Sequence, residues 1–378
     1  TIYSVDSSNS VLEAVAVRNG RVYATGFWKN LKKLANDDTK ILDLQGRTMI
    51  PGFIESHAHL LPLGKQARQL SLVDIHSYEE MIEKVVAATK AQAPGTWILG
   101  RGWHQSKWNV QEGFVKGYQT HHSLSKQTPN HPVMLIHASG HALFANAMAM
   151  ELAGLNEEMD FGEYGEIIRD ENGKATGIFT ENAMDVIKSI VPEDTPESRY
   201  EDLMAGMRTS LAHGITSFQD AGSDAGAIAA YRRAIENDAL NMRIWAMLSC
   251  EHNDVPFNDP FVENWFQKGP EIGDWLTIRA VKLYADGALG SRGAWLLNEY
   301  TDRNGHFGNP VQPIELIEEV AQKGLSAGFQ VCTHAIGDRA NREVLDAYEK
   351  AFMRYPEKAK DHRFRIEHAQ HLHPMDIP

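Results

Sequence analysis

The sequence has few cysteines, no long apolar run and a minority of basic residues among its charged ones. Only two of its 378 residues are cysteine, which excludes a disulfide framework and a cysteine-rich zinc module. No apolar run approaches the roughly 20 residues of a membrane span, so we expect no membrane segment. Basic residues are in the minority, since 37 Lys and Arg against 50 Asp and Glu give a net charge of −13. An acidic surface repels phosphate backbones and anionic headgroups, so we expect no nucleic-acid or membrane partner.

The composition is that of a folded α/β protein. Hydrophobic residues make up 43 % and charged residues 23 %, so a sizeable core can form. The length allows two or three ordinary domains or one large barrel with attachments. The segment after Thr1 lacks the charged and apolar regions of a signal peptide, so we expect a cytoplasmic protein, with a cleaved signal peptide left open. Histidine is the abundant functional residue, at 17 copies.

Hydrophobic patterning predicts alternating strands and helices along most of the chain. Strands are expected near residues 50, 215, 243, 279, 329 and 364, and helices at about 197–213, 224–236, 313–326 and 338–354. This alternation favours βαβ units and a parallel sheet. Residues 1–48 predict a small β domain, in which Asn19-Gly20 is a hairpin turn. Ser77 and Glu80 have the spacing of a capping box at the start of a helix.

Several predicted strands end in residues that bind metals. His57 and His59 are two apart on a strand, so both point to one side with Cα atoms roughly 6.5–7 Å apart. Two imidazoles at that spacing can close on one ion, although a bare His-x-His is also compatible with two surface or capping histidines. His334 and His368 each end a later strand. In a (β/α)8 barrel the strand ends open on one face, which would gather these histidines into one metal site.

At this point the sequence resembles the amidohydrolase superfamily, and within it the YtcJ-like subgroup (amidohydrolase family 3). The resemblance covers nearly the whole chain in the expected order. The motifs that carry it are Asp43-Leu-Gln-Gly46, Pro51-Gly-Phe-Ile-Glu-Ser-His-Ala-His59, Ile98-Leu-Gly-Arg-Gly-Trp-His104, His137-Ala-Ser-Gly-His141, Val281-Lys-Leu-Tyr-Ala-Asp-Gly-Ala-Leu-Gly-Ser-Arg292, Thr333-His-Ala-Ile-Gly-Asp-Arg-Ala340 and Arg365-Ile-Glu-His-Ala-Gln370.

The resemblance implies a distorted (β/α)8 TIM barrel with a small β-sandwich domain at the N-terminus. We expect the β domain at 1–48, the barrel at 49–378 and a large insertion after the first barrel strand, at about 65–195. Only six barrel strands can be counted, so the C-terminal strands are expected to be missing from this sequence. The general-base aspartate of such enzymes is expected beyond Pro378 for the same reason.

The resemblance also implies a ligand set. His57 and His59 would bind a first ion and His334 and His368 a second. Lys282 would be the lysine that is carbamylated in many relatives and bridges the two ions; the alternative is a buried lysine paired with Asp286 or Asp220. We expect one or two divalent ions, zinc by preference, although such a set also suits iron, manganese or cobalt.

Further residues are expected near a small-molecule substrate. By resemblance, His141 contacts the scissile carbonyl or its oxyanion, with a structural turn as the alternative. The expected pocket residues are Arg101, Trp103, His137 and Arg292. Aromatic rings provide apolar walls and arginine recognises anions, yet both residue types also serve in packing and at surfaces.

The sequence thus predicts a metal-dependent amidohydrolase, in which a metal-activated hydroxide cleaves an amide or other C–N bond. Two alternatives stay open. The same metal barrel could act as an ester or lactone hydrolase or as a deaminase, or the protein could be a non-catalytic relative that only binds. A homodimer is a possible assembly, and the substrate is not specified by the motifs.

Overall fold

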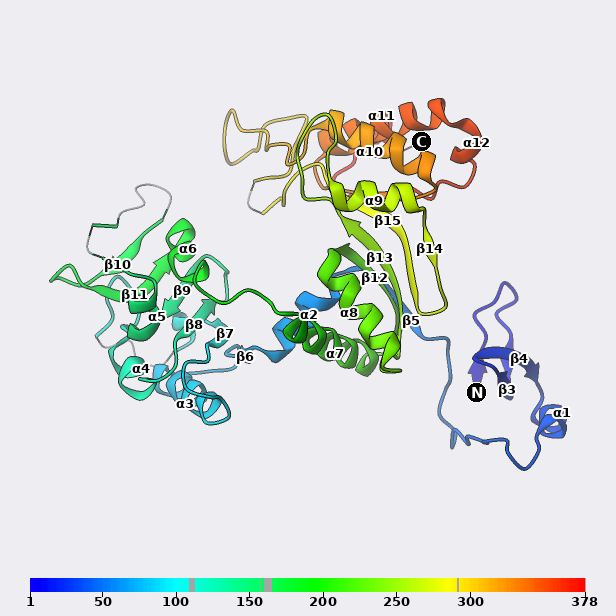
Figure 1. Cartoon of the computed structure of the whole chain (residues 1–378), viewed down its shortest axis with the longest axis horizontal. Coiled ribbons are helices and arrows are strands. Elements are labelled where there is room, and N and C mark those ends of the chain that lie inside the picture. The colour runs from blue at the N-terminus through cyan, green and yellow to red at the C-terminus, as the bar shows by residue number, and fades with distance from the viewer. Residues whose placement is uncertain (109–112, 157, 160–164, 291, 378) are drawn as a thin grey trace. The chain divides into compact units, whose positions relative to one another are not determined.

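A computed structural model describes residues 1–108, 113–156, 158–159, 165–290 and 292–377 (Figure 1). The chain divides into two compact units. The first holds residues 1–58, 210–224 and 239–378, and the second holds residues 59–209 and 225–238. No helix among the described residues is long and apolar enough to cross a membrane.

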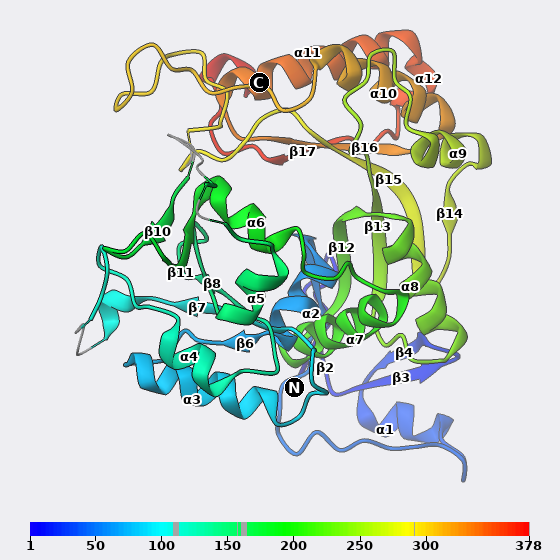
Figure 2. The same cartoon turned by 60° about the vertical axis from the view of Figure 1, so that its left-hand side comes forward.

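The first unit is built on six parallel strands in the order β17-β16-β15-β13-β12-β5, with the short strand β14 antiparallel to β15. Figures 1 and 2 both show β12, β13 and β15 side by side. All six strands expected from the sequence are confirmed, and they form a nearly closed parallel barrel. Their bounds are β5 Phe53–Ala58, β12 Ile215–Ser223, β13 Arg243–Ser249, β14 Glu271–Ile272, β15 Leu276–Tyr284, β16 Gln330–Ala335 and β17 Arg365–His368.

One face of this sheet carries a buried apolar cluster with Lys282 beside it. Ala221, Met247, Ala280 and Cys332 come from four adjacent strands and form a buried cluster. Lys282 follows Ala280 by two residues and pairs with Cys332 of this cluster across the ladder, so its side chain lies on the same face of the sheet. The strand register therefore places the polar residues of neighbouring strands at a common edge.

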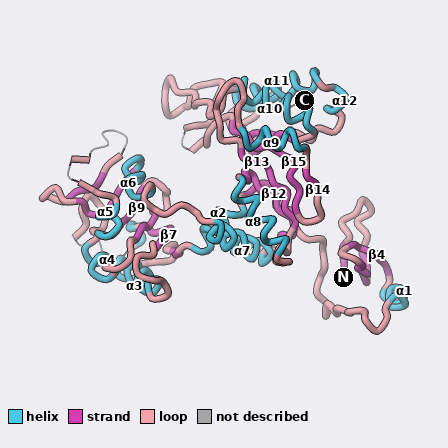
Figure 3. Tube along the Cα trace, viewed as in Figure 1, coloured by secondary structure: helices cyan, strands magenta, loops and turns pink. Residues whose placement is uncertain are grey.

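Helices of the first unit follow the strands, as the alternating pattern predicts (Figure 3). Helices α10 and α11 pack against β16 and against each other. The α10 helix ends at Gly328, whose φ of +86° is the left-handed conformation that glycine favours. The bounds are α9 Pro260–Lys268, α10 Ile314–Ala327, α11 Asp338–Arg354, α12 Pro356–Ala359 and the 3-10 turn η5 Pro374–Asp376.

The N-terminal residues form small antiparallel sheets, β1 with β2 and β3 with β4. Asn19 and Gly20 connect β3 to β4 with φ values of +53° and +72°, which is the geometry of the predicted two-residue hairpin turn. The bounds are β1 Ile2–Tyr3, β2 Val11–Leu12, β3 Ala14–Arg18, β4 Arg21–Gly26, α1 Trp28–Leu31 and η1 Lys32–Leu34.

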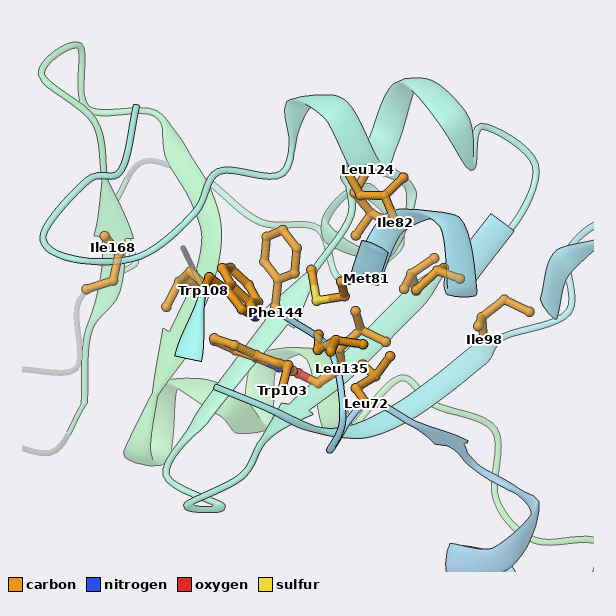
Figure 4. Packing of buried hydrophobic residues seen from close by; sticks show 14 residues of the cluster. Leu72, Met81, Ile82, Ile98, Trp103, Trp108, Leu124, Leu135, Phe144 and Ile168 are labelled. Carbon is orange, nitrogen blue, oxygen red and sulfur yellow. The ribbon is translucent and has the colours of Figure 1, made fainter. Parts of the chain in front are cut away.

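The second unit contains the insertion, a mixed sheet in the order β10-β11-β9-β8-β7-β6. Its core includes Trp103, Trp108, Phe144 and Leu135, which pack against α3 (Figure 4). The bounds are β6 Leu70–Ser71, α3 Tyr78–Thr89, β7 Ile98–Trp103, η2 Gln105–Lys107, α4 His122–Gln127, β8 Val133–His137, β9 Ala142–Ala145, α5 Ala147–Leu152, β10 Ile167–Arg169, β11 Ala175–Thr180, η4 Glu181–Met184 and α6 Asp185–Lys188.

Helix α3 begins as predicted, with one difference. Ser77 is its N-cap, and the Ser77 hydroxyl accepts a hydrogen bond from the Glu80 N–H at 3.0 Å. The Glu80 carboxylate, however, accepts the N–H of His76 rather than that of Ser77. The predicted bond to the Glu80 N–H is therefore present, whereas the reciprocal bond goes to the residue before the N-cap.

Two further helices of the second unit, α2 (Leu60–Arg68) and α7 (Pro196–Ala212), cross at glycines. A Cβ at Gly64 would lie 1.7 Å from the Asp202 carbonyl oxygen, and one at Gly206 would lie 2.3 Å from the Leu60 carbonyl oxygen. The crossing is therefore a backbone contact that only glycine permits. The remaining helix is α8, Ala225–Glu236.

Candidate metal centre

Three of the predicted ligands, from three strands of the first unit, lie together. The ring centroids of His57 and His368 are 4.6 Å apart, and those of His334 and His368 are 4.4 Å apart. His57 lies on β5 and His368 on β17, the two outermost strands of the barrel sheet. The cluster of His57, His334 and His368 therefore joins the first and last strands, as convergence of strand ends predicts.

A carboxylate fixes the orientation of His57. The Nδ1 atom of His57 is 2.5 Å from Oε2 of Glu367, a residue 310 positions further along the chain. Because a carboxylate accepts hydrogen bonds, Nδ1 carries a proton, and in the neutral ring the lone pair is then on Nε2. Histidines that bind metals through one nitrogen commonly donate the other N–H to a carboxylate in this way.

Glu367 is itself held by Arg365. The Arg365 Nε donates to Oε1 of Glu367 at 2.8 Å, and the same guanidinium donates to Gln219 on β12 and to the carbonyl of Ser56 on β5. Burial raises the pKa of Glu367, but the hydrogen bond from His57 and the charge of Arg365 outweigh burial and hold that pKa below its ordinary value. Glu367 is therefore an ionised, positioned acceptor.

His334 presents a nitrogen atom that the described protein atoms leave without a hydrogen bond. Its Nε2 atom is buried and has no hydrogen-bond partner among the described residues. An Asp286 oxygen lies 3.5 Å away, but the Asp286 carboxylate accepts three backbone N–H groups, from Trp295, Ile336 and Gly337. Burial, with the nearby charges of His368 and Lys282, lowers the pKa of His334 to about 4. The ring is neutral at neutral pH and can offer a lone pair.

Lys282 lies deep in the same region. Its side chain is buried, and Nζ sits 4.0 Å from the centroid of the Tyr284 ring. Burial lowers the pKa of Lys282 to about 8, although the charge of Glu367 acts in the opposite direction. Of the two alternative partners, Asp286 is occupied by backbone N–H groups, and Asp220 accepts the Ser223 hydroxyl at 2.6 Å. The amine of Lys282 therefore loses its proton more easily than that of an exposed lysine.

These observations fit a metal site in residue type and in tautomer. His57 keeps a lone pair on Nε2, and His334 holds a buried nitrogen without a hydrogen bond. The rings contact one another edge to face. Among the described residues, no group of three His, Cys, Asp or Glu side chains is arranged so that it could hold a metal ion.

Comparison with known proteins assigns the family. Residues 40–378 match the family described as the amidohydrolase family. The chain belongs to the amidohydrolase family. This confirms the resemblance drawn from the sequence motifs.

Similar proteins include YtcJ of Bacillus subtilis, named as an amidohydrolase, which is 29 % identical over 98 % of this chain and 68 % of its own length. The N-substituted formamide deformylase of Arthrobacter pascens is 29 % identical over 97 % of this chain and 67 % of its own. An uncharacterised metal-dependent hydrolase of Pyrococcus furiosus has a similar crystal structure, with a TM-score of 0.74, 26 % identity, and coverage of 97 % of this chain and 74 % of that one. The chain spans about two thirds of the length of the curated relatives it matches, 64 % in one case.

The fourth predicted histidine of this member of the amidohydrolase family begins the second compact unit. His59 directly follows β5 and is the N-cap residue of α2, where it is exposed. Its φ of −125° continues the extended backbone of the strand. Its role as a ligand stays a prediction.

The residues predicted to contact substrate have varied surroundings. Trp103 is a core residue whose indole N–H donates to the Leu135 carbonyl, and Arg101 is exposed. Arg292 forms a two-point ion pair with Asp302. The two histidines of the 137–141 segment differ: His141 is exposed with Nδ1 3.1 Å from Glu181, whereas His137 is buried.

Sequence reasoning missed Glu367, Arg365 and the structural role of Asp286. The first two stand inside a motif used for His368, and two charged residues within one short predicted strand are the signal that could have revealed them. Asp286 was considered only as a partner for Lys282. In the structure it fixes the backbone that follows His334 instead.

Proposed function

We propose that this amidohydrolase hydrolyses an amide or other C–N bond of a small molecule with the help of one or two divalent ions held by His57, His334 and His368, with His59 and Lys282 completing the set. The observation that supports it most is the pairing of the His57 Nδ1–H with Glu367, which leaves a lone pair aimed away from the carboxylate. A bound divalent ion would lower the pKa of a coordinated water towards about 7 and polarise the substrate carbonyl.

The residues of the chain then have distinct roles. Glu367 holds the tautomer of His57, and Arg365 holds Glu367. Lys282 would help to hold the ions as a carbamate, in which Nζ forms a bond to the carbon of CO2 and loses one proton. His141 contacts the substrate carbonyl or its oxyanion. The relative from Arthrobacter pascens supports C–N hydrolysis because its name describes removal of a formyl group from substituted formamides.

Substrate profiling with a matched variant tests this function. The protein is loaded with zinc, manganese or cobalt and assayed with panels of small amides, esters, lactones and amino-substituted heterocycles. We expect turnover of amides, abolished in His334→Ala and unchanged in His362→Ala, which alters a histidine near Phe352 and Phe364. Turnover of esters alone would indicate an ester or lactone hydrolase, and turnover of ring amines alone would indicate a deaminase. A His334→Ala variant as active as the unaltered protein would refute the proposed metal-dependent reaction.

The dependence of metal uptake on CO2 tests the carbamate of Lys282 separately. Protein stripped of metal and equilibrated in buffer free of CO2 should take up metal poorly, and added bicarbonate should restore the uptake. Lys282→Ala should show no effect of bicarbonate. Metal uptake that is independent of bicarbonate in the unaltered protein would refute the carbamate and leave the histidine ligands in place.

A further inference from the structure

The chain between β15 and α10 forms a loop that is closed at its base. The Val311 N–H donates to the Ala285 carbonyl at 2.9 Å, and Asp286 forms an isolated β-bridge with Pro310. Residues 292–309, the docking segment, lie between these two ends of the loop. The whole loop belongs to the first compact unit, as do the strands that carry His57, His334 and His368.

The docking segment packs against the start of α11. The Trp295 carbonyl accepts the N–H of Ala340, in the first turn of that helix, at 3.2 Å, and the Leu297 N–H donates to Oδ1 of Asp338 at 2.8 Å. A Cβ at Gly337 would lie 2.0 Å from the Trp295 carbonyl oxygen. Because Gly337 is the N-cap residue of α11 and has no side chain to offer, the docking segment supplies an acceptor for the helix start.

The two arms of the docking segment are in close backbone contact. The Leu296 N–H of one arm donates to the Phe307 carbonyl of the other at 2.7 Å. Gly308 has a φ of +76°, and a Cβ there would lie 1.9 Å from the Ala294 carbonyl oxygen. Gly305 has a similar φ of +73°, but a Cβ there would meet no described atom within 4 Å beyond its chain neighbours. A side chain at Gly308 would therefore push the arms apart, whereas one at Gly305 would not.

Asp286 joins the docking segment to the strand that carries His334. Its side chain is fully buried, and its Oδ2 atom accepts the N–H groups of Trp295 and Gly337, both at 2.8 Å. Its Oδ1 atom accepts the N–H of Ile336 at 2.9 Å. Trp295 belongs to the docking segment, whereas Ile336 and Gly337 directly follow β16. A buried carboxylate is costly without such partners, so the three hydrogen bonds favour one arrangement of the two segments.

The same carboxylate lies beside the His334 ring, with Oδ1 3.5 Å from Nε2, and the Ala285 N–H donates to the His334 carbonyl at 2.8 Å. We propose that Asp286 is a positioning residue that couples the docking segment to the metal centre. Docking of residues 292–309 holds His334 in place for a metal ion, and a bound ion in turn favours the docked segment, because coupling of two binding events is reciprocal. The proposal rests on the metal centre of the proposed function and not on the reaction.

Metal affinity and hydrogen exchange of the full chain test the coupling. Dissociation constants for zinc, manganese and cobalt are measured by competition with a chromogenic chelator. Exchange of the Trp295 and Leu297 N–H groups is followed by mass spectrometry on the peptides that contain them, with and without the most tightly bound of the three metals. The variants are Asp286→Asn, Gly308→Ala and the matched control Gly305→Ala. Both alanine variants place a side chain at a left-handed position, but only Gly308→Ala disturbs the arms of the docking segment.

In the unaltered protein, we expect metal to slow exchange at both N–H groups by about fivefold or more, the lower end of usual coupling factors. Gly308→Ala should exchange faster there and bind metal more weakly by a similar factor, whereas Gly305→Ala should match the unaltered protein in both measurements. In Asp286→Asn an amide group that cannot accept replaces one oxygen, so saturating metal should no longer slow exchange in the docking segment. A variant that is merely less stable would exchange faster and still respond to metal.

Exchange in the docking segment that metal leaves unchanged in the unaltered protein would overturn the proposal. So would a Gly308→Ala protein that exchanges faster yet binds metal as tightly as Gly305→Ala, or one that exchanges no faster at all. An unaltered chain that binds none of the three metals would refute the metal centre and the coupling together. Metal binding that slows exchange in a protein that cleaves no C–N bond would keep the coupling and refute the proposed reaction alone.

Discussion

At the scale of single residues, the centre depends on which nitrogen of each imidazole carries a proton. Glu367 assigns that proton to Nδ1 of His57, and Arg365 holds Glu367 in place. The hydrogen bond from His57 and the charge of Arg365 together hold the pKa of Glu367 below its ordinary value. In the insertion, backbone N–H groups make the opposite assignment for His104 and His137. Hydrogen bonding therefore favours one tautomer for the histidine of the first unit and the other tautomer for those of the second.

Replacement of the carboxylate should weaken metal binding without unfolding the protein. Glu367→Gln removes the charge that favours Nδ1–H on His57, and loss of such a partner typically lowers metal affinity about 10- to 100-fold. Competition with a chromogenic chelator measures the affinity. Glu357→Gln, which alters an exposed carboxylate paired with Lys360, is the control and should leave it unchanged. Equal affinities of the two variants would show that Glu367 does not position His57.

The residue scale also shows where sequence reasoning stops. The histidines at strand ends could be predicted, because parallel strands bring their carboxyl ends to one edge. Strand alternation, however, places Glu367 and His368 on opposite faces, yet both reach His57. The reason is that His368 adopts a φ of +75° and Ala369 a φ of +42°, which turn the backbone at the end of β17. No pattern in the sequence specifies those angles.

At the scale of elements, close backbone contact decides how α2 meets α7. Strands and helices after residue 195 could be predicted because their apolar periodicity is local. The crossing of α2 and α7 could not be predicted, because the atoms that contact Gly64 and Gly206 belong to residues more than a hundred positions away along the chain. Glycine ordinarily destabilises a helix, whereas at this crossing its lack of a side chain permits the two helix backbones to come into contact.

Alanine at this crossing should therefore destabilise the protein. Alanine favours an exposed helix over glycine by about 1 kcal/mol, but overpacking costs about 1–3 kcal/mol and must here move backbone atoms. We expect lower melting temperatures for Gly64→Ala and Gly206→Ala. Gly226→Ala in α8 is the matched control, since its Cβ would meet only the flexible end of Arg199. A Gly64→Ala protein as stable as Gly226→Ala would contradict the close contact.

At the scale of the whole molecule, the histidine cluster contains residues from both outermost strands of the barrel sheet. His57 and His368 stand on the outermost strands, and Arg365 also reaches the Ser56 carbonyl across the same gap. An ion at this place would bind the folded chain and not the unfolded one. Metal binding should then contribute to the stability of the first unit by mass action.

Removal of metal should lower the melting temperature. At a free metal concentration 100 times the dissociation constant the contribution is about 2.7 kcal/mol, which corresponds to a shift of roughly 5 °C or more. Differential scanning calorimetry with and without chelator measures the shift, and added zinc should reverse it. His334→Ala should melt at one temperature in both buffers. A shift of the same size in His334→Ala would place the responsible ion elsewhere.

The metal content of the purified protein tests the central claim most directly. Elemental analysis after loading and desalting should find one or two divalent ions per chain, and fewer than one in a variant with His57, His334 and His368 all changed to alanine. No bound ion in the unaltered chain, or the same content in both proteins, would contradict a metal centre at these three histidines.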